Sequence, residues 1–448
     1  MNNELRVILD APFGRLLPFE YQDFSAKCIL SSLYEPLFFK YKNEKEYNSY
    51  YIQRHYVIDN MVVLEFKKDI YWSNGNRITS SDIYQSLLYQ IKHKTKYSYY
   101  LDFIEGVSDY LYNGREFKIG ITNFDHDNKI IIYLSYHVNY YDVFSCIEFA
   151  PVYFENGIPV NTVSNGCFIL SKIGTFNVIV ERNPYFRIKN DFFINKINFI
   201  LCKDLIRPIS LFYENKIDIT SATYFPDHYI SLLGKDVNID TSSILFFLTV
   251  SEDLLYIKNF LLEKMTNFLE SQFNKIISML KDYSLIDKNT YKSVIDNELI
   301  VPLRKRDVSI AYPDYYPNDI IISHLKDVLE GVGFSVSICK FDILNYISLD
   351  KDKYDIYLSL SSLVYYSELN EMIFYAKYIR DDRREEYMSL VNSYIDGDVY
   401  KEIVDRFLTL NSKIFPICSL NFTYLKSLKA DAFYIDENGL YRFNLIKE

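Results

Sequence analysis

The spacing of apolar and polar residues along the chain predicts a mixed α/β protein. Residues 5–10 form a short apolar run and residues 50–70 alternate in two blocks, which is typical of β-strands. Residues 117–135 have the pattern of a hairpin. Residues 25–38 favour a short helix, and from 255 to 280 apolar residues recur at spacings of three and four, which predicts a longer one.

Residues 71–87 predict a strand end, a turn and a helix start in close succession. The pair Asn74-Gly75 favours a tight turn, because glycine adopts positive φ without steric cost. Thr79 is a suitable N-cap, and the Asp82 carboxylate three residues later can reach back to the cap N–H. We therefore expect a helix to begin at about Ser80.

An α/β unit is predicted further along the chain. Residues 307–315, 334–342 and 354–362 read as strands, with an amphipathic helix at 318–333 between the first two. A helix between strands implies parallel pairing, and ligands of such sheets lie beyond the carboxyl ends of the strands. We expect those ends at Ala311 to Tyr315 and at Ser361 to Glu368, in a second lobe that begins near Thr241.

The composition of the chain limits the kinds of molecule that it is expected to bind. The 448 residues correspond to about three domains. A net charge of −10, with no long basic face, argues against nucleic acid as a partner. Six scattered cysteines form no CxxC pair, so free thiols are expected rather than a metal site or a disulfide framework. The acidic residues at 125–128 have a local reason to lie in a hairpin turn, so no metal and no cofactor is expected.

The sequence offers no catalytic motif and no membrane span. It contains no GxSxG, HExxH, Walker A or dinucleotide fingerprint, and its six histidines are scattered, so we expect a protein that is not an enzyme. No apolar run is long enough to cross a bilayer, and the first residues lack a secretory signal. We expect either that export information is absent from this sequence or that the protein is cytoplasmic.

Several motifs, in order, resemble those of the extracytoplasmic solute-binding proteins that serve oligopeptide, dipeptide and nickel ABC importers, solute-binding protein family 5. The motif with the only tryptophan, WSNGNRITSSDIYQSL, is similar to that family's Trp-Ser-Asp-Gly and Thr-Ala-Glu-Asp-Val sequence. The other similar segments are LRVILDAPFGRLLPF, LYEPLFFKY, SNGCFILSKI, ERNPYF, LFYENKIDIT and the final LYRFNLIKE.

The resemblance implies a two-lobed periplasmic-binding-protein fold of type II, in the α/β class, with an extra small subdomain. We expect lobe I to comprise residues 1–240 and 408–448, with the subdomain at about 40–150, and lobe II to comprise residues 241–407. The lobes of such proteins close around a solute by a hinge motion.

The resemblance also implies the function and the ligand contacts. The expected role is that of a monomeric binding protein for peptides or peptide-like molecules that delivers them to an ABC permease outside the cytoplasm. A cytoplasmic sensor or regulatory module derived from the same fold is the alternative. The residues expected near the ligand are Arg15, Leu16, Gly166, Phe168, Phe247, Val364, Tyr365, Tyr366 and Glu368.

The sequence departs from the family where peptides are recognised. The family's aspartate that binds a peptide's amino group corresponds to Val364, so that carboxylate is missing, although Glu368 is nearby. Leu17 replaces the aspartate of the family's Leu-Asp-Pro, and Thr249 stands in place of an asparagine. Because a buried ammonium without a carboxylate is costly, we expect an apolar, aromatic-rich or N-terminally blocked ligand.

Overall fold

The computed structural model describes residues 4–41, 44–112, 118–186, 194–223, 225–240, 244–273, 277–278, 306–362, 368–395, 397–436 and 438–443. The chain divides into two compact units, Met1–Ser221 with Leu425–Glu448 (unit 1) and Ala222–Tyr424 (unit 2). Among the described residues, no helix has the length and apolar character to cross a membrane. The lobe boundaries expected from the sequence remain predictions.

Unit 1 contains two four-stranded sheets. In the first, of order β1-β10-β9-β8, β1 is parallel to β10 and the other pairs are antiparallel. In the second, of order β2-β3-β5-β4, all pairs are antiparallel. The strands are β1 Glu4–Leu9, β2 Ile52–Ile58, β3 Met61–Phe66, β4 Ile121–Phe124, β5 Lys129–Tyr133, β6 Phe154–Glu155, β7 Ile158–Pro159, β8 Phe168–Ile173, β9 Asn177–Arg182, β10 Lys196–Leu201, β19 Tyr434–Ile435 and β20 Tyr441–Arg442.

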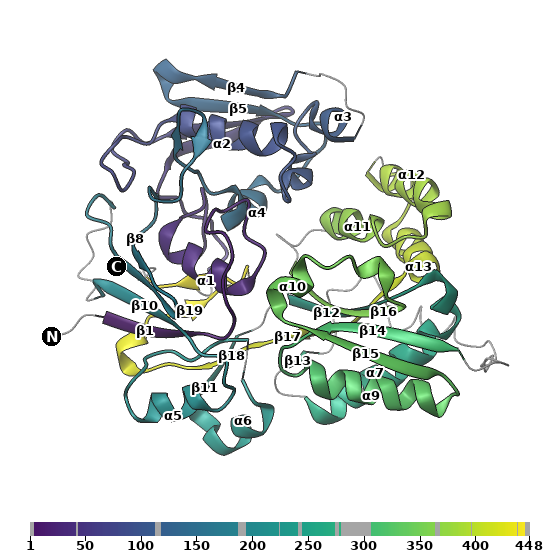
Figure 1. Ribbon diagram of the computed structural model, residues 1–448. Helices are drawn as coiled ribbons and strands as arrows, with labels where there is room; N and C mark the ends of the chain where they lie inside the picture. The colour runs from purple at the N-terminus through teal and green to yellow at the C-terminus, as the bar shows by residue number, and fades with distance from the viewer. Residues whose placement is uncertain are drawn as a thin grey trace. The chain divides into compact units, whose positions relative to one another are not determined.

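Helices cover the sheets of unit 1. Figure 1 shows α2 against β4 and β5, so this helix closes one face of the second sheet. Helix α1 packs against β8 and β20, strands that are distant in sequence. The helices are α1 Phe24–Leu33, α2 Ser80–Lys92, α3 Val107–Tyr112, α4 Tyr140–Phe144 and α5 Arg207–Tyr213.

Unit 2 is built on a six-stranded sheet of order β13-β17-β12-β16-β14-β15. Strands β14, β15 and β16 are mutually parallel, as the sequence predicts, whereas β12 is antiparallel to both β16 and β17. The strands are β11 Val237–Asp240, β12 Ile244–Val250, β13 Ile277–Ser278, β14 Asp307–Pro313, β15 Ser335–Phe341, β16 Ile356–Ser362, β17 Ile414–Leu420 and β18 Phe422–Leu425, whose last residue belongs to unit 1. Strand β11 pairs with β18.

Two helical layers flank this sheet. In Figure 1, α7 and α9 run together along one face, whereas α10 to α13 lie on the other side. Phe247 of β12, Tyr387 and Leu408 belong to a buried core with α11, α12 and α13. The helices are α6 Asp227–Leu233, α7 Lys258–Gln272, α9 Asn318–Gly331, α10 Ile343–Ile347, α11 Glu368–Ala376, α12 Arg384–Ile395 and α13 Lys401–Asn411, with 3-10 turns η6 Lys351–Lys353 and η7 Asp381–Arg383.

One sequence expectation is wrong in its extent. Among the described residues of 255–280, the predicted helix covers Lys258–Gln272, and the short strand β13 follows at Ile277–Ser278. Ile277 of β13 continues the helical spacing of apolar residues, but it pairs with Leu420 of β17 instead. Pairing with a buried strand therefore outweighs local helical periodicity there.

Candidate functional site

The predicted contacts in unit 1 come from two separate segments. Arg15 is exposed and pairs with Glu20, at 2.9 Å between Nη1 and Oε2, whereas the neighbouring Leu16 is buried. Gly166 and Phe168 precede and begin β8, and Phe168 is buried with its ring edge-to-face against Phe443. Their role as ligand contacts stays a prediction.

Gly166 lies where the chain passes very close to the end of α1. Its N–H donates to the Leu33 carbonyl at 2.8 Å. A Cβ at this position would stand 2.6 Å from the Leu33 carbonyl carbon and oxygen and 2.8 Å from the Tyr34 nitrogen. These are backbone atoms that cannot rotate away, so only glycine fits here.

Several of the segments that resemble the family's motifs are joined by hydrogen bonds near Gly166. Ser73 N–H donates to the Ser164 carbonyl at 2.9 Å, and Ser164 N–H donates to the Ser73 hydroxyl at 3.0 Å. The side-chain amide of Asn183 donates through Nδ2 to the Gly166 carbonyl at 2.9 Å. Trp72, fully buried, packs edge-on against Tyr153. The tryptophan motif, the Ser-Asn-Gly turn and the Asn-Pro strand end thus form one hydrogen-bonded junction.

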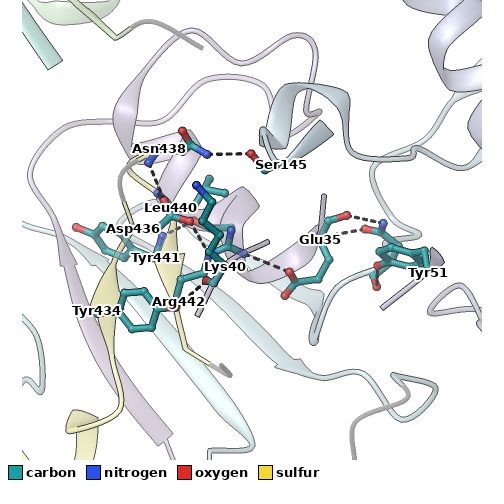
Figure 2. A network of polar contacts seen from close by, with 12 residues as sticks. Glu35, Lys40, Tyr51, Ser145, Tyr434, Asp436, Asn438, Leu440, Tyr441 and Arg442 are labelled. Carbon is teal, nitrogen blue, oxygen red and sulfur yellow. Dashed lines mark hydrogen bonds and ion pairs between the residues drawn. The ribbon is translucent and has the colours of Figure 1, made fainter. Parts of the chain in front are cut away.

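A buried polar network continues from this junction (Figure 2). Arg442 places Nη1 at 3.3 Å from Glu35 Oε2 and Nε at 2.8 Å from Asp436 Oδ2. Asn165 exchanges two hydrogen bonds with the Glu35 backbone, and the Tyr51 hydroxyl donates to the Asn165 carbonyl at 3.0 Å. The network thereby fastens the C-terminal strand β20 to the end of α1.

Arg442 remains charged in this network. Burial by itself lowers the pKa of the guanidinium, but the carboxylates of Asp436 and Glu35 outweigh burial and raise the pKa above its usual value. Asp436 also accepts hydrogen bonds from the N–H groups of Asn438 and Leu440. The network thus ties segments of unit 1 that are distant in sequence to one another.

In unit 2 the predicted ligand end of the parallel strands carries a cluster of charged and hydroxyl groups. Lys340, at the end of β15, lies 2.8 Å from carboxylate oxygens of both Asp314 and Asp319. The Tyr312 hydroxyl donates to the Asp319 carboxylate at 2.6 Å. Burial is the main cause that raises the pKa of Tyr312 to about 12, and the Asp319 carboxylate adds to it. The Tyr315 hydroxyl lies 2.6 Å from the Thr223 hydroxyl.

Of the ligand contacts predicted in unit 2, Phe247 lies within the described residues and the others do not lie fully within them. Phe247 is 1% exposed and packs edge-on against Phe374 and Tyr378. Val364, Tyr365 and Tyr366 lie outside the described residues, as does the side chain of Glu368, the first residue of α11. In the described ranges no group of three or more His, Cys, Asp or Glu side chains could hold a metal.

Comparison with known proteins finds similarity only at the level of structure. No family model and no curated protein sequence matches the chain. Among solved structures, Haemophilus influenzae OppA in complex with RPPGFSPFR aligns with a TM-score of 0.79 at 16% identity, over 95% of each chain. The Escherichia coli murein tripeptide binding protein MppA aligns at 0.78 and 14%, over 95% of this chain and 94% of its own. Listeria monocytogenes OppA bound to peptide aligns at 0.77 and 16%, over 99% and 100%.

These alignments cover nearly the whole length on both sides, with high TM-scores. At such low identity they establish the fold. The fold expected from the sequence is therefore confirmed: this is an α/β chain with the architecture of the two-lobed periplasmic binding proteins to which OppA and MppA belong.

Proposed function

We propose that this chain is a peptide-binding protein of the ABC-importer type, which closes two lobes around its ligand and presents it to a permease. One observation carries the proposal. Solved structures that match over 94–100% of their length are OppA with a bound peptide and a murein tripeptide binding protein. The match spans both units, which supports the proposal.

The rigid junction of unit 1 supports this function. A protein that closes by moving whole lobes needs lobes that do not deform. The buried Arg442 network and the close contact of Gly166 with α1 tie distant segments of unit 1 together, which supports movement of this unit as a whole. Binding energy can then be used for closure, and about 5.5 kcal/mol of preference for the closed state converts a mostly open population to a mostly closed one.

The chain also passes twice between the units through paired segments, which suits a hinge. Within unit 1, Thr220 N–H donates to the Leu425 carbonyl, and Leu425 N–H donates to the Thr220 hydroxyl. Within unit 2, Thr423 N–H donates to the Ala222 carbonyl. The two crossings therefore run side by side.

We propose that the ligand contacts are those expected from the sequence, Arg15, Leu16, Gly166, Phe168, Phe247, Val364, Tyr365, Tyr366 and Glu368. Arg15 is 78% exposed at its side chain and its partner Glu20 is 24% exposed, so their ion pair is weak. A peptide carboxylate can replace Glu20 as the partner of Arg15 at small cost. Extended peptides would be held chiefly through backbone hydrogen bonds, which leaves sequence selectivity loose.

We further propose that the ligand's amino end is apolar or blocked, because Val364 stands where the family has an aspartate. Titration calorimetry with the nonapeptide RPPGFSPFR and its N-acetyl form tests this. We expect the acetylated form to bind at least as tightly as the free one. Tenfold tighter binding of the free peptide, about 1.4 kcal/mol, would contradict the blocked-ligand proposal.

If the free peptide binds more tightly than its acetylated form, two variants identify the carboxylate that causes this difference. Glu368→Gln removes the carboxylate nearest in sequence to the missing aspartate, and Glu385→Gln removes an exposed carboxylate in the first turn of α12. Loss of the preference in Glu368→Gln alone would show that Glu368 takes over the family role. Failure of both peptide forms to bind would count against this peptide as a ligand and weaken the proposed function.

A further inference from the structure

A cleft of about 610 Å³ lies within unit 2, beside the start of β16. Its size is within the range of about 300–1,000 Å³ that small-molecule sites occupy. It is formed by the end of β12, the segment around η6, the start of β16, the turn after α11, the start of α12 and the residue before β17. The lining residues are Thr249, Val250, Ser251, Glu252, Asp352, Tyr354, Tyr357, Lys377, Tyr378, Asp381, Arg384 and Lys413.

This cleft is distinct from the carboxyl ends of the parallel strands. Thr249 and Val250 pair with Tyr357 and Ile356, so the cleft adjoins the amino end of β16. The carboxyl end of that strand, Ser362, lies about 20 Å further along it at about 3.3 Å per residue. The ligand end predicted for the parallel strands and this cleft therefore occupy opposite ends of β16.

Backbone hydrogen bonds join the walls of the cleft. Val250 N–H donates to the Lys413 carbonyl at 2.8 Å, and Lys413 N–H donates to the Tyr378 carbonyl at 2.8 Å. On the other side, Ser251 N–H donates to the Asp355 carbonyl at 2.7 Å. Four segments that are distant in sequence, at Val250–Ser251, Asp355, Tyr378 and Lys413, are thus tied at this point, which makes the cleft a preformed feature of unit 2.

Charges of both signs line the cleft in exposed pairs. Lys413 Nζ lies 3.1 Å from Glu252 Oε1, and Arg384 Nη2 lies 2.7 Å from Asp381 Oδ1. The two carboxylates are 46% and 75% exposed, so these pairs contribute little stability and can be exchanged for a ligand's charges. A ligand with one charge would meet like charges as well, whereas a zwitterion can pair with both signs.

Tyrosine rings provide the apolar part of the wall. Tyr354, Tyr357 and Tyr378 line the cleft. The ring of Tyr378 is held against Phe247 at a centroid distance of 5.7 Å, and Lys377 Nζ lies 4.8 Å from the ring centroid of Tyr378. Fixed aromatic faces favour flat apolar groups.

We propose that this cleft is a second binding site, for a small zwitterion with an aromatic body, the class to which aromatic α-amino acids belong. The carboxylate of the ligand pairs with Arg384 or Lys413, its ammonium pairs with Glu252 or Asp352, and its ring lies against the tyrosines. None of the proposed peptide contacts lines the cleft, although one of them, Phe247, packs against Tyr378.

Titration calorimetry of the full chain with L-phenylalanine tests the proposal, with L-phenylalanine methyl ester and N-acetyl-L-phenylalanine as ligands that each lack one charge. We expect saturable binding of L-phenylalanine, and binding at least about fivefold weaker for each derivative, a difference of about 1 kcal/mol. Arg384→Gln is expected to weaken L-phenylalanine binding by a similar factor.

Arg383→Gln is the matched control. Arg383 is adjacent to Arg384, is similarly exposed and forms an equivalent pair with Glu386 at 2.8 Å, but it does not line the cleft. We expect Arg383→Gln to bind as wild type does. No binding up to about 10 mM overturns the proposal, as does equal binding by wild type and Arg384→Gln, which would place the amino acid elsewhere. Neither result bears on peptide binding.

Discussion

Lys258 is a buried cation whose neighbours are neutral oxygens. It begins α7 and donates to the Thr409 carbonyl at 3.2 Å and to the Ser412 carbonyl and hydroxyl at 2.8 and 3.0 Å. Burial lowers the pKa of its ammonium to about 7. These hydrogen bonds tie α7 to the end of α13, at the cost of desolvating the amine.

The folded state therefore releases this proton at a lower pH than the unfolded state does. Between about pH 7 and 10 Lys258 is protonated to a greater extent in the unfolded chain, so its contribution to the free energy of unfolding rises with pH by at most about 1.4 kcal/mol per unit. Urea unfolding of wild type and Lys258→Met measures this slope. We expect the Lys258→Met variant to lack the rise and Lys264→Met, at an exposed position of the same helix, to keep it. Parallel pH profiles for wild type and Lys258→Met would refute the assignment.

Arg442 is expected to be essential for the stability of unit 1. Arg442→Met leaves the buried Glu35 and the partly buried Asp436 without a cation, and the loss of a cation from a buried pair typically costs about 3–5 kcal/mol. Arg15→Met, which removes an exposed ion pair with Glu20, should leave the urea midpoint unchanged. Equal midpoints for the two variants would show that the network of Figure 2 contributes nothing.

At the scale of elements, the turn before β8 is expected to tolerate no side chain at Gly166. Gly166→Ala places a Cβ against the backbone of Leu33 and Tyr34, so α1 or the turn must move, at a cost of about 1–3 kcal/mol. Gly331→Ala, at the end of α9, meets open space and should be neutral or slightly stabilising. Thermal unfolding of both variants checks this. Similar melting temperatures would mean that the junction adapts.

Elements with strong local signals could be predicted from the sequence. Helix α2 begins at Ser80, as predicted. The Asp82 carboxylate accepts a hydrogen bond from the N–H of the N-cap residue Thr79 at 2.7 Å, which is the interaction of a capping box. The hairpin of β4 and β5 turns at Asn128, whose φ is +51°. The β14-α9-β15 unit is parallel as predicted, because an amphipathic helix between two apolar runs leaves few alternatives.

Features that depend on distant contacts could not be predicted in this way. The Glu35–Arg442 pair joins residues at opposite ends of the chain, and nothing in the local sequence marks either as buried. The cleft of unit 2 draws its lining from β12, β16, α12 and other segments, so its position follows only from the sheet order. The overall fold was predicted from the motifs that resemble a family, whereas the periodicity of apolar residues predicted individual elements.

At the scale of the whole molecule, the proposed function predicts a ligand that accompanies the protein. Lobes that close on a peptide retain it when affinity is high, because dissociation requires reopening. Protein purified gently from its own host is therefore expected to carry bound material. The mass difference between native and denatured protein measures that material directly.

Native mass spectrometry of such a preparation, with fragmentation of whatever is released on unfolding, tests peptide binding most directly. We expect a population heavier than the bare chain, and released species that fragment as short peptides rich in apolar or aromatic residues, with blocked amino ends among them. A preparation whose bound material is consistently non-peptidic would contradict the account.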